Sequence, residues 1–552
     1  MLDYRTTNVT KRYNTVRVYG AIAVNGSKYV QVKRGKRGVG NGATRKTSPW
    51  IPLGDFQGQA KEAAAVLEKS GMLFFGSELT ELKEHLTDFD DFEEMPVFVR
   101  QGWDDDGRYA FADGDAYGVD DDDKAAFAFP TDPAIYDSKG SLKDWRRNLA
   151  APLAGHDLPE FCLMAGLASA LLGPAEHPHN FGFELVGPPK SGKSTIANAV
   201  ASIVGPADGV EGGFVISMNA TANAINQIMG GFHDLPLVLE EWNLTALRAG
   251  ANAGTNSAQL IADLADGHER LRHNSTKRGR SRFIWLTSTN QAWYEQASSL
   301  PHDVVRAYAD RMMTIPVDDI DDGGVFDASA LGGHSLGSLA KRVAAASHQY
   351  HGTAYRAFVE YLVGRGSVED DDDLGSEIAK MLRQFDRILA NRGLEVDERM
   401  APSLGLVYAA GRLAKKAGVL PDAFNPKRAV LAVLGRILGA TAALKPPVSI
   451  LQELVRSSGC ADWRNKKEYM PAKRFWASSG VVRSSRTGDE LVLTRDQLAA
   501  LPIETKRLLN DPQVRKLLKR VTDRPTSKRT IIFKEEMPMY CFRLDALMAV
   551  KA

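Results

Sequence analysis

A glycine-rich turn between an apolar strand and an apolar helix constrains the fold of this chain more than any other feature. Residues 187–194 read Gly-Pro-Pro-Lys-Ser-Gly-Lys-Ser, which fits the phosphate-loop pattern Gly-x-x-x-x-Gly-Lys-Ser. The run before it, residues 181–186, favours a strand, and the run after it, residues 195–204, favours a helix. Such a turn points backbone N–H groups inward and directs a helix N-terminus at an anion. The sequence therefore predicts an α/β core with a phosphate site after one of its strands.

The phosphate-loop pattern assigns roles to individual residues. Lys193 would reach the β- and γ-phosphates of ATP, and Ser194 would hold Mg²⁺ through its hydroxyl. ATP and Mg²⁺ are therefore the predicted ligands. The residues predicted to bind the nucleotide are Gly187, Pro188, Pro189, Lys190, Ser191, Gly192, Lys193, Ser194 and Thr195.

A second apolar run, residues 235–241, ends in the two carboxylates Glu240 and Glu241. In a parallel sheet, ligands gather at the carboxyl ends of the strands. We expect Glu240 to hold Mg²⁺, directly or through water, and Glu241 to orient and polarise the attacking water. Aspartate is usual in the first place, so Glu240 departs from the pattern and leaves the division of labour between the two acids open.

Polar and basic residues around two further predicted strands complete the catalytic set. The run 282–290 ends in Asn290, which we expect to hydrogen-bond the lytic water or the γ-phosphate, with Thr287 and Ser288 as competitors. Arg311 precedes another apolar run and is the candidate arginine supplied across a subunit interface, where it would neutralise transition-state charge. Arg306 is the weaker candidate, and surface ion pairing is the alternative for both.

A basic segment lies between the acidic run and the Asn290 run. Residues 267–280 predict a β-hairpin with its turn near 275–279. In a ring ATPase, an insertion at this position can project into the pore, where Lys277, Arg278 and Arg280 would grip the phosphates of a threaded strand. An exposed basic turn or a subunit contact is the alternative.

Charge is distributed unevenly although the formal net charge is only +1. Residues 1–60 hold 11 basic and 2 acidic side chains, residues 61–150 hold 10 and 22, and residues 441–552 hold 22 and 12. Basic ends around an acidic stretch suggest contact with a polyanion at particular faces. The three cysteines are widely spaced and fit a reducing cytoplasm, and no run is long enough to span a bilayer.

The chain divides into four predicted regions. A hairpin signal at Asn25-Gly26, a helix over residues 61–70 and a capped helix start at Ser141 belong to the first. The last region mixes short helices with strands such as 490–493, which predicts a winged-helix-like unit. The regions are a mixed α+β domain at 1–150 that would bind DNA or a partner, the ATPase core at 151–330, a helical connector at 331–440, and the basic C-terminal unit at 441–552.

These motifs and their order resemble the AAA+ class of P-loop ATPases, and more closely the family described as domain of unknown function 927, found on phages and mobile elements. The resemblance covers roughly residues 90–420 and implies a relationship to minichromosome-maintenance-type and superfamily-three helicases. It also implies a homohexamer with a hairpin entering the pore. Besides the phosphate loop, the segments that carry the resemblance are residues 101–103, 141–145, 219–223, 234–237, 265–270, 311–316, 350–354 and 409–414.

The leading hypothesis is a cytoplasmic, ATP-driven ring helicase of a mobile element that threads single-stranded DNA and unwinds forked duplex. Lys193, Ser194, Glu240, Glu241 and Asn290 would act within one subunit, and Arg311 would complete the site of its neighbour. An element-encoded primase, polymerase or initiator is a candidate partner. The alternative is an ATP-gated DNA-binding assembly or defence switch without unwinding. A small-molecule phosphotransferase ranks last, because no acceptor-site signature stands out.

Overall fold

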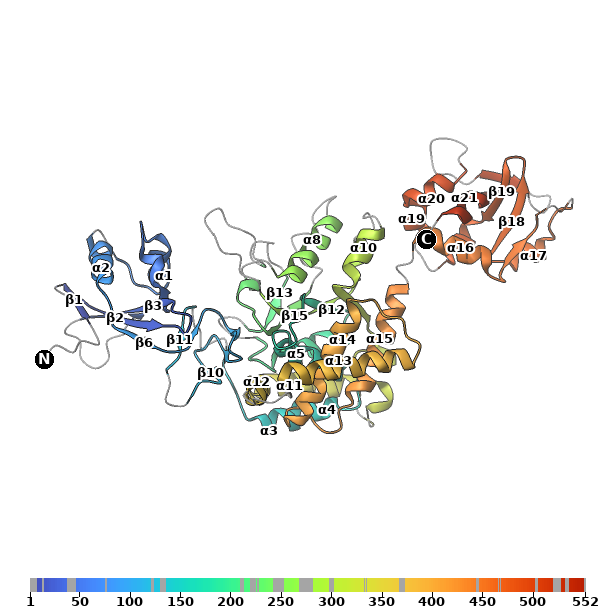
Figure 1. The fold of residues 1–552 in the computed structure, drawn as a ribbon. Helices are drawn as coiled ribbons and strands as arrows, with labels where there is room; N and C mark the ends of the chain where they lie inside the picture. The colour runs from blue at the N-terminus through green and yellow to red at the C-terminus, as the bar shows by residue number, and fades with distance from the viewer. Residues whose placement is uncertain are drawn as a thin grey trace.

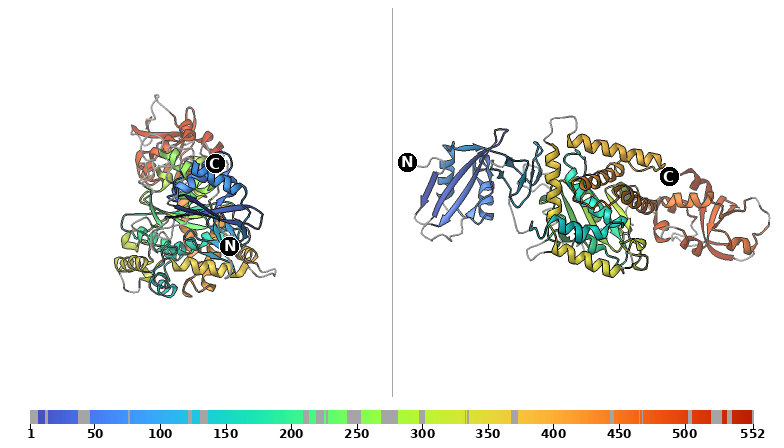
Figure 2. Two further views of the ribbon diagram at one scale, coloured as in Figure 1. Left: turned by 90° about the vertical axis from the view of Figure 1, so that its left-hand side faces the viewer. Right: turned by 90° about the horizontal axis from the view of Figure 1, so that it is seen from below.

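The computed structural model shows three bodies that follow one another along the chain: an N-terminal unit, a central unit and a C-terminal unit (Figure 1). The right-hand view in Figure 2 shows the same succession from blue to red. The structure describes residues 7–11, 14–36, 46–74, 77–120, 124–129, 136–208, 213–218, 225, 228–241, 253–267, 281–296, 302–331, 333, 335–366, 373–442, 446–464, 466, 468–501, 505–519, 528–531 and 536–550.

The N-terminal unit is a six-stranded sheet with two helices on one face, and its strand pairs are antiparallel except for the parallel pair of β2 and β6. The predicted hairpin is confirmed: β2 and β3 pair around Asn25-Gly26, and Gly26 has a φ of 80°. The alternating side chains Val18, Val30 and Val32 are buried against the helices. The elements are β1 (Thr7–Lys11), β2 (Asn14–Ile22), β3 (Lys28–Lys36), β4 (Lys46–Thr47), β5 (Ile51–Pro52), η1 (Leu53–Phe56), α1 (Lys61–Lys69), α2 (Ser77–Thr87) and β6 (Phe92–Glu94).

Short strands and a capped helix connect this sheet to the central unit. The Ser141 hydroxyl accepts a hydrogen bond from the Asp144 amide at 3.1 Å, as the predicted helix start requires. Trp103, Tyr109 and Trp145 belong to the central hydrophobic core, so the packing of the central unit already begins near residue 101 rather than near 150. The elements are β7 (Val97–Phe98), β8 (Gly102–Trp103), β9 (Tyr109–Ala110), β10 (Ala116–Tyr117), β11 (Ala126–Phe127), α3 (Leu142–Trp145), η2 (Arg146–Ala150) and α4 (Ala151–Leu153).

The central unit is built on a five-stranded sheet in the order β13-β14-β15-β12-β16, and every neighbouring pair is parallel. Near-continuous apolar runs form its strands because helices cover both faces. Four of these strands, β12, β14, β15 and β16, are runs that the sequence predicted. The strands are β12 (Phe181–Val186), β13 (Val215–Ser217), β14 (Leu235–Glu240), β15 (Phe283–Thr289) and β16 (Met312–Pro316).

Alternate residues of β15 separate the two layers of core. Ile284 and Leu286 face the layer that contains α5, whereas Phe283 and Trp285 face the layer that contains α8. Helices α14 and α15 in turn pack on α5. The elements around the sheet are α5 (Asp157–Ala168), η3 (Ser169–Leu171), α6 (Lys193–Ala201), α8 (Ala253–Asp266), α9 (Trp293–Gln296), α10 (His302–Ala309), η6 (Ile320–Asp322), η7 (Ala328–Ala330), α11 (Leu336–Gln349), α12 (Thr353–Gly366), α13 (Leu374–Asn391), α14 (Met400–Lys416) and α15 (Pro426–Ala442).

The C-terminal unit is a mixed sheet of five strands in the order β17-β18-β19-β21-β20. The winged-helix-like unit predicted from the sequence has the mixture of short helices and strands that the structure shows. The prediction did not include this sheet, in which the β18–β19 hairpin lies between β17 and β21. The elements are α16 (Pro447–Arg456), β17 (Cys460–Asp462), α17 (Ala472–Trp476), β18 (Gly480–Ser485), β19 (Gly488–Leu493), α18 (Arg495–Ala499), α19 (Thr505–Asn510), α20 (Pro512–Leu517), β20 (Lys528–Ile531), β21 (Glu536–Arg543) and α21 (Leu544–Ala549). Among the described residues, no helix has the length and apolar character needed to cross a membrane.

Candidate nucleotide-binding site

The phosphate loop occupies the carboxyl edge of the central sheet, between β12 and α6. Its backbone is held from both sides: the Gly187 amide donates to the Thr289 carbonyl at 3.2 Å, and the Val325 amide donates to the Ser191 carbonyl at 2.9 Å. Gly192 precedes α6 with a φ of 96°, and a Cβ there would lie 2.6 Å from the Val325 side chain. Only glycine fits this position without strain, because the left-handed conformation and the close neighbour both disfavour a side chain.

Lys193 lies at the centre of the loop. Its ammonium nitrogen is 2.7 Å from the carbonyl oxygens of Gly187 and Pro188, and 3.2 Å from Asn290 Oδ1. Burial lowers the pKa of Lys193 from its usual value. The loop therefore folds around a desolvated cation, which is the setting in which a phosphate oxygen would gain most from contact with an ammonium group. Ser194, the next residue, is exposed at the first turn of α6.

Asn290 is the polar residue of its strand end that reaches Lys193. Thr287 and Ser288, its competitors in the sequence, are buried within β15, and the Thr287 hydroxyl has no hydrogen-bond partner among the described residues. Asn290 instead lies just past the strand and is exposed. Geometry therefore brings Asn290 and Lys193 together and leaves the other two candidates inside the sheet.

The two predicted acids differ in environment. Glu240 is the last residue of β14, where it pairs with Ser217 of β13, and its Oε1 atom is buried without a hydrogen-bond partner among the described residues. Glu241 is exposed and takes a φ of 58°, a left-handed conformation that is uncommon outside glycine. A buried carboxylate oxygen without a partner is costly, and a cation or a polar ligand would satisfy it.

The donor set at this edge fits a nucleotide with Mg²⁺. Glu240 and Ser194 would supply hard oxygen ligands of the kind that Mg²⁺ prefers, and β14 and β12 both end at the same edge with β15 between them. Among the described residues there is no cluster of three or more histidine, cysteine or carboxylate side chains that could hold a metal. Magnesium commonly keeps several waters and substrate phosphates as ligands, so a sparse protein donor set is the expected one.

Glu184 is a supporting residue that the sequence reasoning missed. It lies in the middle of β12 and is fully buried, with its carboxyl oxygens accepting from the Trp293 amide and the Thr314 hydroxyl, both at 3.0 Å. Burial raises the pKa of Glu184 to about 8, and these two hydrogen bonds oppose the rise. Glu184 thereby ties the turn after Asn290 to the strand that carries the phosphate loop. The available signal was one charged residue in an otherwise apolar run.

Arg311 lies at the opposite edge of the sheet from its own phosphate loop. Its carbonyl accepts from the Gly182 amide, at the start of β12, and its guanidinium lies 5.2 Å from the Tyr308 ring centroid. Gly182 and Gly187 are five residues apart, which is about 16 Å along a strand. Within one chain, the structure therefore does not bring Arg311 to the loop. Arg306 is exposed on α10.

A buried ion pair supports the opposite, amino-terminal edge of the sheet. Asp234 is fully buried just before β14 and accepts from Arg282 at 2.8 and 2.7 Å and from the Trp103 amide at 3.0 Å. A Cβ on Gly102 would lie 2.6 Å from the Asp234 carboxylate, which explains the glycine of the Gln-Gly-Trp segment. Burial raises the pKa of Asp234, and Arg282 opposes that rise. His233 is neutral here, because burial lowers its pKa to about 2.

The basic segment inserted before β15 lies outside the described residues, and so do Lys277, Arg278 and Arg280. Its two ends are described. The Ser281 amide donates to the Gly267 carbonyl at 2.8 Å, which joins the end of α8 to the start of β15. Asn180 donates to the Ser281 carbonyl at 3.0 Å and accepts from the Phe283 amide at 3.1 Å. Residues 219–223 also lie outside the described residues.

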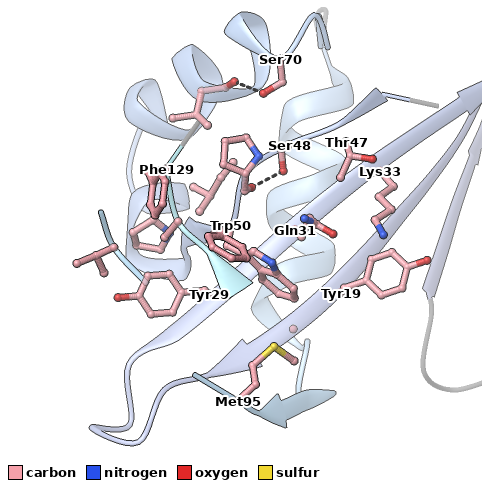
Figure 3. A pocket seen from close by; sticks show the side chains of 18 of the residues that line it. Tyr19, Tyr29, Gln31, Lys33, Thr47, Ser48, Trp50, Ser70, Met95 and Phe129 are labelled. Atoms are coloured by element: carbon pink, nitrogen blue, oxygen red, sulfur yellow. Dashed lines mark hydrogen bonds between the residues drawn. The ribbon is translucent and has the colours of Figure 1, made fainter. Parts of the chain in front are cut away.

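A cavity of about 1690 Å³ lies away from this chemistry, in the N-terminal unit (Figure 3). Tyr19, Trp50 and Lys33 are among the side chains that line it. Both basic and acidic residues line the cavity: Lys33, Lys69 and Lys124 on one side of the charge balance, and Asp55, Glu62, Asp91 and Glu93 on the other. The charge of the cavity therefore does not select one class of ligand. We therefore place the candidate active site at the phosphate loop, where Lys193 contacts Asn290 and where β14 ends in two carboxylates at the same edge of the sheet.

Comparison with solved structures finds a fold like that of this chain. A structure described as "SCCmec type IV Cch - active helicase" matches with a TM-score of 0.56 and 14% identity, covering 99% of this chain and 98% of that one. NtrX from Brucella abortus in complex with ATP matches at 15% identity over 46% and 67% of the two chains, with a TM-score of 0.19. The apo C-terminal region of NrS-1 matches at 9% identity over 95% and 96%, with a TM-score of 0.24.

Only the first of these likenesses is close enough to bear on the fold, and it shows the mixed α/β architecture of a helicase structure across nearly the whole chain. A search of curated proteins finds no match. The resemblance drawn from the sequence motifs is confirmed for one region: residues 42–282 match the family described as "Domain of unknown function (DUF927)".

Proposed function

We propose that this protein is an ATP-driven DNA helicase or translocase that works as a ring of identical subunits. Four observations support the proposal: the phosphate loop closed around Lys193, the contact of Lys193 with Asn290, the unpartnered oxygen of Glu240, and a fold similar to that of a protein described as an active helicase. The contact between Lys193 and Asn290 carries the proposal, because it brings the loop after β12 and the end of β15 together at one point.

Each residue of the proposed site has a distinct task in ATP hydrolysis. The backbone N–H groups at the start of α6 and the Lys193 ammonium bind phosphate oxygens. Asn290, already in contact with Lys193, orients the γ-phosphate or the attacking water, and Glu241 accepts the proton from that water. Ser194 and Glu240 would hold Mg²⁺, which when bound neutralises charge on the phosphates.

The proposed site needs a second copy of the chain. Arg311 lies beside Gly182, and about 16 Å of strand separates Gly182 from the start of the phosphate loop at Gly187. In this proposal Arg311 therefore acts on the nucleotide of a neighbouring subunit. An arginine placed in this way stabilises the charge of the transition state and makes hydrolysis depend on assembly. The proposal therefore includes an oligomer in which each site is completed in trans, and a hexameric ring is the form that the family resemblance implies.

The DNA contact is assigned to the basic segment before β15. Lys277, Arg278 and Arg280 belong to it, and its ends are joined by the Gly267–Ser281 hydrogen bond. The Arg282 side chain, directly after the segment, is clamped by Asp234. In this proposal β15 couples the DNA contact to the nucleotide site, because this strand carries the anchor of the segment at its start and Asn290 just past its end.

Strand separation of a forked DNA duplex with a fluorophore and quencher tests the function directly. The proposal predicts ATP-dependent separation that is lost with Lys193→Ala and with a non-hydrolysable ATP analogue. Hydrolysis without separation would contradict the helicase and favour the ATP-gated assembly or switch.

A further inference from the structure

The C-terminal unit contains a segment along which exposed aromatic and basic side chains alternate. It is the connection between β17 and β18, described at residues 463–464, 466 and 468–479, which includes α17 and lies at the outer end of the unit (Figure 1). We name its exposed members, Lys466, Tyr469, Lys473, Arg474 and Trp476, the aromatic–basic surface. All five are exposed, with 54% of Tyr469 and 55% of Trp476 accessible to solvent.

The backbone beneath this surface is firmly held. Met470 and Phe475 are buried in a small core against Val481 and Val492. The indole nitrogen of Trp463 donates to the Glu468 carbonyl at 3.0 Å, which closes the loop before α17. Tyr469 and Trp476 are therefore each adjacent to a buried anchor residue, and little ordering of the backbone at these two positions would be needed to bind a ligand.

The charge of the surface is positive and available. Among the described residues, neither Lys473 nor Arg474 forms an ion pair, and the Arg474 guanidinium lies 4.9 Å from the Trp463 ring centroid. By contrast, Arg464 nearby is neutralised by Asp462 at 2.6 Å. Exposed large aromatic side chains beside unpaired cations are uncommon on a surface that meets only water.

From this combination we infer that the aromatic–basic surface binds single-stranded nucleic acid, as a site separate from the ATPase centre. Bases would stack on Trp476 and Tyr469, and Lys473 and Arg474 would contact the phosphates. Stacking on aromatic side chains requires unpaired bases and tolerates any sequence. A duplex would offer the same phosphates but no exposed base faces, so the aromatic residues favour a single strand.

Binding of a labelled oligothymidine of about 20 nucleotides, longer than most single-strand sites, tests the inference by fluorescence anisotropy in the full chain. Nucleotide is left out, so the result does not depend on ATP hydrolysis, and the C-terminal variants are compared with the wild type because the basic segment before β15 would bind the same probe. Trp476→Ala should weaken binding about 5-fold or more, and Trp476→Phe should restore much of the loss. Removing Lys473 and Arg474 together should reduce the salt slope by about 1.4, at about 0.7 per phosphate contact.

A matched control removes the same charge elsewhere. Arg383 and Arg387 are exposed on α13, and their double alanine variant should leave the salt slope unchanged. Thermal unfolding of each variant verifies the fold. Wild-type affinity and slope in both C-terminal variants would overturn the inference, and so would equal competition by duplex DNA or by polyglutamate, because either result would indicate charge attraction without stacking.

Photocrosslinking locates the contact without any substitution. Ultraviolet crosslinking to the oligothymidine, followed by trypsin and mass spectrometry, should attach nucleotide to the peptides 468–473 and 475–483, which contain Tyr469 and Trp476. Crosslinks confined to other parts of the chain would contradict the assignment of this surface.

Discussion

Glu184 provides a quantitative test of how the sheet supports the proposed site. Its buried carboxyl joins β12 to the turn after Asn290 and to β16. Burial raises its pKa from the ordinary 4.5 to about 8. Between these pH values the folded protein retains a proton that the unfolded chain has released. The contribution of Glu184 to the free energy of unfolding is therefore fully present below the lower pKa and is lost as the pH rises through the upper one.

The size of this effect follows from the one proton involved. The free energy of unfolding can fall by at most about 1.4 kcal/mol per pH unit, or roughly 2–3 kcal/mol between pH 5.5 and 7.5. Glu184→Gln replaces the carboxyl by a neutral group of the same shape that can still accept from the Trp293 amide. The variant should lose this pH dependence, so its stability relative to the wild type should rise with pH.

Urea denaturation followed by tryptophan fluorescence measures the difference, because Trp285 and Trp293 are buried in the layer beside Glu184. Asp386→Asn, which removes an exposed carboxylate on α13, serves as the control and should retain the wild-type slope. A Glu184→Gln variant whose stability tracks that of the wild type at every pH would refute the buried-proton argument.

Three further predictions concern assembly, folding and DNA. Mixing the inactive variants Lys193→Ala and Arg311→Ala should restore ATP hydrolysis at up to about a quarter of the sites, because a complete site then needs one subunit of each kind; no recovery in mixed oligomers would contradict action in trans. Asp234→Ala should lower the free energy of unfolding by about 3 kcal/mol, because it leaves Arg282 and the Trp103 amide without their partner. Asp462→Ala breaks an exposed ion pair and should lower it by less than about 1 kcal/mol. Equal urea midpoints for the two variants would be evidence against the buried network. Lys277→Ala combined with Arg278→Ala should abolish stimulation of hydrolysis by single-stranded DNA, and retained stimulation would remove the basic segment from the DNA contact.

Local patterns in the sequence predicted much of the central fold. The apolar runs before Gly187, before Glu240 and before Asn290 are buried parallel strands, because such runs are covered by helices on both faces. The hairpin at Asn25-Gly26 and the cap at Ser141 also follow from chemistry within a few residues. The spacing of the glycines and the lysine also predicted that Lys193 belongs to the loop, and its ammonium group contacts the Gly187 and Pro188 carbonyls there.

Other features depend on contacts between distant residues and could not be predicted from the pattern alone. Asp234 and Arg282 are 48 residues apart, and Trp103 is 131 residues from Asp234, so no local signal indicated their network. The same long-range packing moves the start of the central unit from near residue 150 to near 101. Glu184 was overlooked because its partners, Trp293 and Thr314, are supplied by later elements.

Steady-state ATP hydrolysis with and without single-stranded DNA tests the central claim most directly, with Lys193→Ala as the control. We predict hydrolysis that increases when DNA is added and disappears in the variant, because Lys193 would hold the phosphates and bound DNA would drive the turnover. Hydrolysis that proceeds at the same rate with and without DNA would contradict a DNA motor, and hydrolysis that survives in Lys193→Ala would contradict the site itself.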